Sequence, residues 1–211
     1  MAQKRAPLLV IDRAHPEPHR VRQAVQRLRD GEVIVYPTDT IYGLAVDIDH
    51  RPGIERLYRL RKLDPKKPLA LVCSSLSEAA RYATITNDCF RFMRRVLPGP
   101  YTFVLKATRD VPKTGDAKRR AVGIRIPDSP VALALVAELG RPILTTSAIV
   151  EDANPDDLSD PVALAEHYGD GVALVLDVGI LEGTPSSVID WSDDHPTVLR
   201  RGAGDVEGLE A

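Results

Sequence analysis

Long apolar runs are missing from this sequence of 211 residues. No segment approaches the roughly 20 apolar residues that a membrane-spanning helix needs. The short apolar run Leu8–Ile11 is flanked by Pro7 and Asp12, which is not the pattern of a secretory signal. We therefore expect a cytoplasmic, soluble protein that has no membrane as a partner.

Cysteine is scarce as well, since the chain contains only Cys73 and Cys89. Two free buried thiols are the predicted state, with a disulfide as the alternative. No spacing of cysteine and histidine is typical of a metal site, and the five histidines stand in polar or loop-like contexts. The residues themselves therefore predict no metal ligands.

Common catalytic signatures are also absent. The sequence contains no GxxxxGK[ST], GxGxxG, HExxH or GxSxG motif, so the standard nucleotide-binding loops and hydrolase sites are excluded. The formal net charge of −2 excludes polyanion binding by net charge, and such binding would need a local basic patch. Candidate basic groups are Arg56, Arg59, Arg61, Lys62, Lys66, Lys67, Arg91, Arg94, Arg95, Lys118, Arg119 and Arg120.

Size and periodicity predict a single domain over residues 1–211 with a mixed fold. With 44% hydrophobic residues the chain can bury a substantial core. Apolar residues repeat with helical spacing over residues 17–30 and end at Gly31. Short β-rich runs recur at Glu32 to Tyr36, Leu69 to Cys73, Tyr101 to Ala107, Ala121 to Ile126, Ile143 to Ser147, Val172 to Val178, Ser187 to Trp191 and Thr197 to Arg200. An α/β or α+β protein follows, and the hairpin-like spacing of the last two runs indicates a sheet that is not purely parallel.

Helix starts and loops can be placed from local signals. Ser75 and Glu78 have the spacing of a capping box, and Ser129 followed by Pro130 predicts another helix start. Residues 113–120 and 150–160 combine charge with little apolar periodicity, so we expect two mobile surface loops there.

The most informative stretch is Pro37-Thr38-Asp39-Thr40-Ile41-Tyr42-Gly43-Leu44, which follows an apolar run ending at Tyr36. Proline cannot donate to a sheet ladder, so a central strand should stop before it and leave the polar cluster at its carboxyl end. Ligands bind at that end of strands in open α/β sheets. The box is therefore predicted to bind a ligand.

Arg125 is a second candidate. In the run Gly123–Pro127 the period of two places Arg125 beside Gly123 on the face opposite the isoleucines. A guanidinium there suits a carboxylate or phosphate, which its planar fork can grip with two hydrogen bonds. The alternative is an exposed strand arginine. Hydroxyls at the strand ends Pro98–Thr102 and Thr145–Ser147 could converge on the same cleft, although threonine and serine are also ordinary strand and turn residues.

These motifs, in this order, resemble the YrdC/YciO superfamily, whose best-known members are L-threonylcarbamoyladenylate synthases. The resemblance covers about residues 17–205. It rests on Pro37–Leu44, Arg59–Lys62, Lys67–Leu69, Pro98–Thr102, Gly123–Asp128, Thr146–Ala148, Pro185–Asp190 and Val198–Gly202. It implies a twisted mixed parallel and antiparallel sheet with flanking helices and a positively charged concave cleft, and it leaves no room for the extra C-terminal domain of longer members.

The resemblance also implies a reaction and a set of contacts. Threonine, bicarbonate and ATP would yield threonylcarbamoyl-AMP and pyrophosphate for modifying an adenosine in tRNA, with Mg²⁺ on the phosphates. Arg61 and Arg125 would act by positioning and charge, so no catalytic residue is expected. The implied substrate contacts are Thr38, Tyr42, Thr102 and Arg125, and the implied nucleotide contacts are Arg61, Lys67, Ser147, Ser187 and Arg200.

Two signatures of the synthases are altered here. The KxR triplet corresponds to Arg61-Lys62-Leu63, and the SxN triplet to Ser147-Ala148-Ile149. Losing one charge-assisted phosphate contact costs roughly 1.5–3 kcal/mol. Both changes are typical of the YciO-type branch, to which the chain is similar.

Three functions remain open at this point. The first is a synthase of threonylcarbamoyl-AMP with weak activity. The second is a module that binds tRNA or double-stranded RNA through the basic groups, whose alternative interpretation is a set of solvated helix faces. The third is a related nucleotidyl or carbamoyl transferase that acts on another small amine or acid.

Overall fold

A computed structural model of the chain describes residues 5–64, 68–112, 121–149, 159–181, 183–193 and 195–209. The α-helices among these residues are α1 (Pro18–Arg29), α2 (Arg51–Leu60), α3 (Leu76–Tyr82), α4 (Asn87–Val96), α5 (Pro130–Leu139) and α6 (Pro161–Tyr168). The strands are β1 (Leu8–Val10), β2 (Ile34–Tyr36), β3 (Gly43–Asp47), β4 (Ala70–Val72), β5 (Ala83–Thr84), β6 (Tyr101–Ala107), β7 (Ala121–Arg125), β8 (Ile143–Ser147), β9 (Leu174–Asp177), β10 (Ser187–Asp190) and β11 (Thr197–Arg200).

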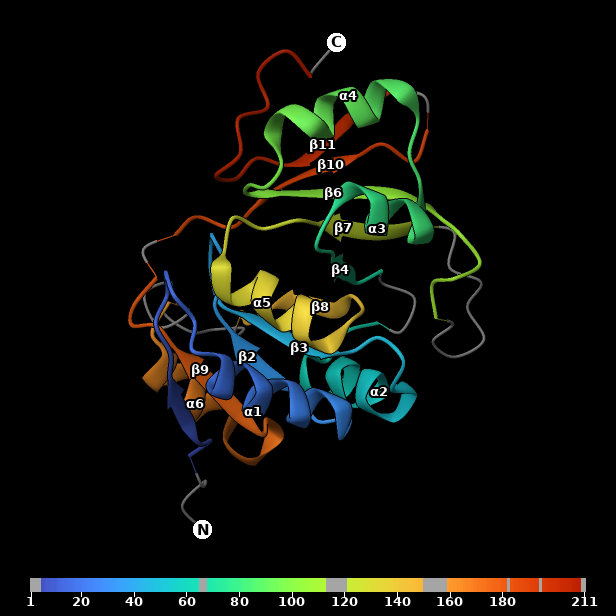
Figure 1. Cartoon of the computed structure of the whole chain (residues 1–211). Coiled ribbons are helices and arrows are strands. Elements are labelled where there is room, and N and C mark those ends of the chain that lie inside the picture. The colour runs from blue at the N-terminus through green and yellow to red at the C-terminus, as the bar shows by residue number, and fades with distance from the viewer. Residues whose placement is uncertain are drawn as a thin grey trace.

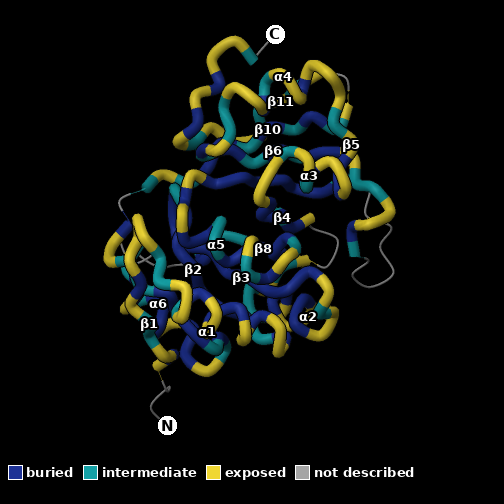
Figure 2. The backbone as a smooth tube through the Cα atoms, viewed as in Figure 1, coloured by how far each residue is buried: buried dark blue, intermediate teal, exposed yellow. Residues whose placement is uncertain are grey.

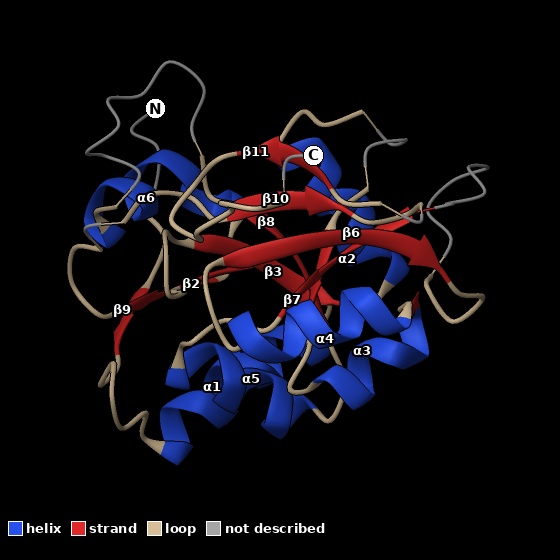
Figure 3. Cartoon of the chain, turned by 90° about the horizontal axis from the view of Figure 1, so that it is seen from above, coloured by secondary structure: helices blue, strands red, loops and turns tan. Residues whose placement is uncertain are grey.

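These strands form one mixed sheet with the order β1-β9-β2-β3-β8-β4-β7-β6-β10-β11, and β5 pairs with β6 at the side (Figure 1). Pairings such as β4 with β7 are parallel, whereas β3 with β8 and β10 with β11 are antiparallel. Figure 3 shows α1, α3, α4 and α5 along one side of the sheet and α6 on the other. The expected mixed sheet with flanking helices is thereby confirmed, as is the antiparallel pairing of the last two strands.

Burial follows this layering, with the central strands buried and the outer helix faces exposed (Figure 2). The apolar residues of α1, which repeat with helical spacing, form one face that packs with α5 against β2 and β9. Cys73 and Cys89 are buried and free, as predicted. None of the helices in the described ranges is long and apolar enough to cross a bilayer.

Besides the two-residue β5, two longer strands were not predicted. β3 lies directly after the polar box, and all five of its residues are buried. β1 coincides with the short apolar run near the start of the chain and pairs in parallel with β9, far away in the sequence. Both are short and buried or edge elements, for which local pattern is a weak signal. The loop over residues 113–120, and most of that over 150–160, lie outside the described residues.

The helix caps follow the sequence in part. The Ser129 hydroxyl accepts from the Ala132 N–H at 3.3 Å at the start of α5, as predicted. At α3 the Ser75 hydroxyl accepts from the Glu78 N–H at 3.2 Å, but the Glu78 carboxylate accepts from Ser74 instead of closing the reciprocal box. His50 is also not simply a solvated surface residue, because its Nδ1 accepts from the Gly53 N–H and caps α2.

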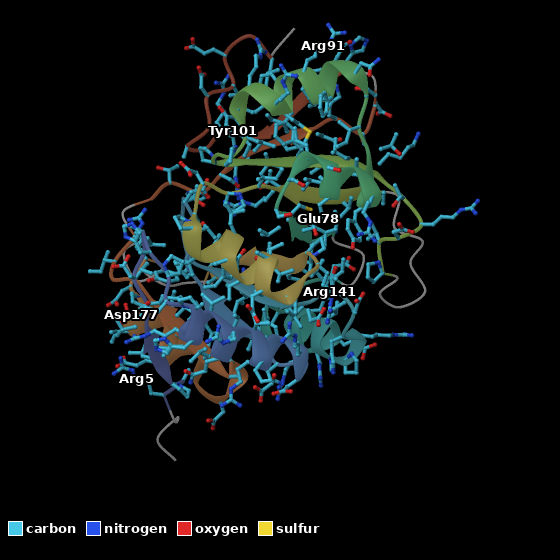
Figure 4. All side chains as sticks on the ribbon, in the orientation of Figure 1. Arg5, Glu78, Arg91, Tyr101, Arg141 and Asp177 are labelled. Carbon is cyan, nitrogen blue, oxygen red and sulfur yellow. The ribbon has the colours of Figure 1, made fainter. Side chains whose placement is uncertain are left out.

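Side-chain contacts tie distant segments to the sheet (Figure 4). Arg141, after α5, forms a bidentate ion pair with Asp47, the last residue of β3, and also contacts Asp49 at 3.2 Å. At the other end of the molecule the Tyr101 hydroxyl donates to the carbonyl oxygen of Asp205 at 3.0 Å. The second contact places the C-terminal segment beside the start of β6.

Candidate functional site

A cavity of about 340 Å³ lies across seven neighbouring strands, from β3 through β8, β4, β7, β6 and β10 to β11. Arg61 and Leu63, just after α2, and Ile149, two residues after β8, complete its wall. Its lining residues are Tyr42, Gly43, Arg61, Leu63, Pro68, Leu69, Ala70, Thr102, Val104, Gly123, Arg125, Thr145, Thr146, Ser147, Ile149, Ser186, Val188, Leu199 and Arg200.

The period of two along each strand brings many of these side chains to one face. Gly123 and Arg125 line the cavity from β7, as the sequence predicted, and Thr102 lies beside them on β6. A Cβ atom at Gly123 would meet the Cα and Cβ atoms of Ala70 at 3.0 Å and the methyl of Thr102 at 3.4 Å. Glycine at this position therefore keeps the floor of the cavity open.

Arg125 forms a buried ion pair with Asp39 from the polar box. Its Nη2 donates to Asp39 Oδ1 at 2.9 Å and to the Thr40 hydroxyl at 3.2 Å, while Asp39 Oδ2 accepts from the Asp128 N–H at 3.1 Å. The side chains of Arg125 and Asp39 are only 9% and 8% exposed, so the alternative of an exposed strand arginine is wrong. Arg125 Nε is buried and has no hydrogen-bond partner among the described residues.

Two further arginines line the cavity. Arg200 donates from Nε and Nη2 to the carbonyl oxygen of Ser186, at 3.0 and 2.8 Å. Partial burial, and then the positive charge of Arg125, lower the pKa of Arg200. Arg61, at the end of α2, donates to the carbonyl oxygen of Ile149. Arg61 and Arg200 have neutral partners, so their charges are free to stabilise an anion in the cavity, whereas the charge of Arg125 is paired with Asp39.

Hydroxyl groups stand between these cations. The Thr102 and Ser186 hydroxyls are 2.9 Å apart, and the Ser186 hydroxyl also accepts from Arg200 at 3.3 Å. Ser147 lines the cavity at the end of β8. Ser186 was not among the predicted contacts, and the only signal for it was the pair of serines at the start of β10, where Ser186 precedes the strand and Ser187 begins it.

Not every predicted contact faces the cavity in this structure. The Ser187 hydroxyl donates to the Gly204 carbonyl oxygen at 2.6 Å and accepts from the Gly202 N–H at 2.9 Å, so it holds the C-terminal turn. The Thr38 hydroxyl is buried, donates to the Ile41 carbonyl oxygen at 2.7 Å and shapes the box.

Tyr42 lines the cavity, but its hydroxyl donates to the Gly179 carbonyl oxygen at 2.8 Å. Burial raises the pKa of Tyr42 well above its usual value. Lys67 lies outside the described residues. Arg61, Thr102, Arg125, Ser147 and Arg200 are therefore the predicted contacts that the structure gathers with polar or charged side chains at one cavity.

The two altered signatures meet at the same wall. Leu63 and Ile149 both line the cavity beside Arg61. Together with Val104, Val188 and Leu199 they give the cationic cavity an apolar side. Leucine and isoleucine therefore occupy positions where a longer cation and an amide would project into the same space.

The cavity offers a poor metal site of its own. Its described lining residues include no carboxylate, and no group of three metal-ligating side chains occurs in the described part of the chain. Magnesium prefers carboxylate, phosphate and water oxygens. An ion that accompanies a nucleotide would therefore be held mainly by the phosphates.

The basic groups that could bind nucleic acid are divided in the structure. Arg56 and Arg59 are exposed on α2, whereas Arg91, Arg94 and Arg95 are exposed on α4, at a different end of the molecule (Figure 1). Arg91 pairs with Asp88 at 3.1 Å. These exposed arginines therefore do not form one continuous strip. Of the other candidates, Arg61 lines the cavity and Lys62 is exposed, while those at 66–67 and 118–120 lie outside the described residues.

Comparison with known proteins identifies the fold and its relatives. The Sua5, YciO and YrdC family model, described as "Telomere recombination", matches residues 26–202. The uncharacterized protein YciO of Escherichia coli strain K12 is 39% identical over 194 residues, which cover 92% of this chain and 94% of YciO. The E. coli YciO crystal structure superimposes with a TM-score of 0.88 at 37% identity, covering 96% of this chain and 98% of that one.

Relatives with a stated activity or ligand are more distant. Threonylcarbamoyl-AMP synthase of Bacillus subtilis is 31% identical over 207 residues, covering 96% of this chain but 59% of the synthase. P. abyssi Sua5 complexed with L-threonine has a TM-score of 0.83 at 27% identity, covering 92% of this chain and 57% of that one. This chain belongs to the Sua5, YciO and YrdC family, as shown by the shared sheet, the polar box after β2 and the match over most of the length of the chain.

Proposed function

We propose that this protein is an L-threonylcarbamoyladenylate synthase-like enzyme of low activity. It would bind ATP, L-threonine and bicarbonate and form threonylcarbamoyl-AMP, which serves the modification of an adenosine in tRNA. The single observation that carries the proposal is the convergence of three arginines and several hydroxyls on one cavity of about 340 Å³. The named activity of the B. subtilis relative and the L-threonine complex of P. abyssi Sua5 support the choice of reaction.

The reaction needs positioning and charge more than a protein nucleophile. The amino group of L-threonine and bicarbonate form a carbamate with loss of water. A carbamate oxygen then attacks the α-phosphorus of ATP, the bond to the bridging β-phosphate oxygen breaks, and pyrophosphate leaves. Negative charge moves onto the pyrophosphate in this step, so fixed cations accelerate it. Arg61 and Arg200 would neutralise the phosphates, and Arg125 would orient the threonine part.

The hydroxyls would complete the polar wall. Thr102, Ser147 and Ser186 line the cavity and can donate to phosphate or carboxylate oxygens. A direct contact of Thr38 with L-threonine and a nucleotide contact from Lys67 stay predictions. The predicted nucleotide contact of Ser187 is the alternative to its role in the C-terminal turn, where its hydroxyl bonds to Gly202 and Gly204. Mg²⁺ would enter on the phosphates of ATP.

A second candidate is a related nucleotidyl or carbamoyl transferase that acts on another small amine or acid. Leu63 and Ile149 favour it, because they give the cavity an apolar side where the synthase signatures carry polar groups. Such a wall would accept a more apolar acceptor than threonine. Under this alternative ATP binds without enhancing the affinity for L-threonine.

Isothermal titration of ATP and L-threonine, separately and together, tests the proposal. Mutual enhancement of the two affinities, with pyrophosphate released at high enzyme concentration in the presence of Mg²⁺ and bicarbonate, is the expected result. Arg200→Gln should weaken ATP binding by about ten- to a hundredfold, because it removes a charge-assisted contact. Arg51→Gln, on an exposed side chain of α2, is the matched control and should bind normally. Absence of both nucleotide binding and pyrophosphate release would refute the synthase assignment.

A further inference from the structure

Arg125 differs from the other two cavity arginines in the charge of its partner. Asp39 Oδ1 lies 2.9 Å from Arg125 Nη2, and both side chains are more than nine-tenths buried. Arg61 and Arg200 instead donate to the neutral groups of Ile149 and Ser186 among the described residues. One of three cations is therefore already compensated by a carboxylate before any ligand enters.

Asp39 is itself held firmly in place. Its Oδ2 accepts from the Asp128 N–H at 3.1 Å, in the loop before α5, while the Thr40 hydroxyl accepts from the same Arg125 nitrogen. The carboxylate cannot swing away without losing these contacts. Arg125 is thus fixed with its Nη2 engaged and its buried Nε without a partner among the described residues. A donor that is buried and unpaired costs free energy, which a ligand acceptor would relieve.

The charge on that acceptor is restricted by Asp39. An anion that reaches the Nε edge is attracted by the guanidinium and repelled by the carboxylate beside it, so the ion pair gives it little net attraction. For a dianion both terms double, whereas the cost of removing the anion from water rises with the square of its charge. We propose that Asp39 is a specificity-determining residue, which makes the Arg125 end of the cavity accept a singly charged carboxylate and reject a dianionic phosphate. The inference rests on the proposed function only for the identity of the substrate that carries the carboxylate. It assigns the phosphates to Arg61 and Arg200, whose described partners are neutral groups.

The wild-type protein provides the first test. The Nε–H resonance of Arg125 is followed in protein labelled with ¹⁵N-arginine and assigned by its loss in Arg125→Lys. At about pH 8, where phosphate is mostly a dianion, sodium acetate should shift this resonance at a concentration at which inorganic phosphate does not. An equal response to both anions at the same ionic strength would overturn the proposal. The test needs no enzymatic activity.

Asp39→Asn provides the second test, since it removes one negative charge and keeps the shape of the side chain. Inorganic phosphate should then shift the Arg125 resonance at a concentration about tenfold lower than in the wild type, because the repulsion is gone. Asp49→Asn, which removes an exposed carboxylate paired with Arg141, is the matched control and should leave the response unchanged.

The outcomes separate this inference from the proposed reaction. A phosphate response in Asp39→Asn that equals the wild type contradicts the role of Asp39. If Asp39→Asn does not fold, the comparison of acetate with phosphate in the wild type decides alone. If ATP and L-threonine do not bind while Arg125 still prefers acetate, the synthase assignment fails and the specificity assigned to Asp39 stands.

Discussion

Arg200 and Ser186 are joined by three hydrogen bonds that all run from the guanidinium to the serine, two to its carbonyl oxygen and one to its hydroxyl. The same hydroxyl lies 2.9 Å from the Thr102 hydroxyl on β6. Ser186 therefore fixes the guanidinium of Arg200 at the cavity and links it to β6, the strand that pairs with β10. Its neighbour Ser187 points the other way, into the turn at Gly202 and Gly204.

Replacing these two serines should separate binding from stability. Ser186→Ala removes the link between Arg200 and Thr102, so we expect ATP affinity to fall by about three- to tenfold with a loss of only about 1 kcal/mol in the free energy of unfolding. Ser187→Ala leaves two buried backbone groups unpaired and should cost about 1–3 kcal/mol without changing ATP affinity. Urea unfolding and calorimetric titration of both variants provide the measurement. The reverse pattern would show that Ser187 is the ligand contact.

Filling the floor of the cavity should block binding. A Cβ at Gly123 would lie 3.0 Å from Ala70 and 3.4 Å from Thr102, which is tighter than ordinary packing. Gly123→Val places two further methyl groups in the space between Arg125 and Thr102 and should reduce ligand affinity more than a hundredfold, as seen by titration. Val122→Ala, on the opposite buried face of β7, is the control. It should lower the unfolding free energy but keep binding, and equal loss of binding in both variants would contradict the assigned floor.

The fold could be predicted from the sequence wherever a local signal coincides with its tertiary role. Pro37 ends β2 as expected, and the run at Tyr101–Ala107 is a strand with the predicted bounds. The polar box hid the start of β3, because this buried strand begins at a glycine directly after residues 38–42, four of which carry polar side chains. That strand is stabilised by pairing with β2 on one side and β8 on the other. Pairing with a distant strand cannot be predicted from the few residues of the strand itself.

The site could be predicted at the level of strand ends but not of individual hydroxyls. Arg125 was found because glycine two positions earlier marks an open face. The sequence could not distinguish Ser186 from Ser187 at the start of β10, since a shift of one residue reverses which side chain faces the cavity. The buried partner of Arg125 could not be predicted either. Asp39 lies 86 residues away in the sequence, and only the pairing of the whole sheet brings them together.

The two cysteines should be unreactive in the native state. Burial raises the pKa of Cys89 from 9.0 to about 12 and also raises the pKa of Cys73. Iodoacetamide at about pH 9 should therefore label neither thiol in native protein and both in urea, as read by mass spectrometry. Because the pKa of each thiol is higher in the folded state, the folded protein keeps the thiol protonated to a higher pH than the unfolded chain does. The contribution of the protonated thiols to the free energy of unfolding is fully present below the pKa of the unfolded thiol. It is lost as the pH rises above about 9.

Cys89→Ala is the control for that pH dependence. Its free energy of unfolding should fall less steeply between about pH 8.5 and 10 than that of the wild type, even if the variant is less stable at neutral pH. Parallel slopes, or rapid labelling of native Cys89, would contradict the predicted thiol state.

Restoring the two altered signatures should strengthen the nucleotide side of the cavity. Leu63→Arg adds a cation beside Arg61, and Ile149→Asn adds an amide at the end of β8, both at positions that line the cavity. A charge-assisted contact to phosphate contributes roughly 1.5–3 kcal/mol, so Leu63→Arg should raise ATP affinity by about ten- to a hundredfold. A neutral amide contributes about 1 kcal/mol, or about fivefold. The double variant should approach the product of the two factors only if both groups reach the same ligand.

Leu63→Met and Ile149→Leu keep the apolar wall and serve as matched controls, for which ATP affinity should stay within about threefold of the wild type. Calorimetric titration of ATP gives the affinities, and pyrophosphate release with L-threonine and bicarbonate gives the rate. If Leu63→Arg binds ATP more tightly but releases no more pyrophosphate, the apolar wall binds an acceptor other than L-threonine. That outcome favours the transferase over the synthase. If neither reverted variant binds ATP more tightly, the phosphates do not lie beside Arg61.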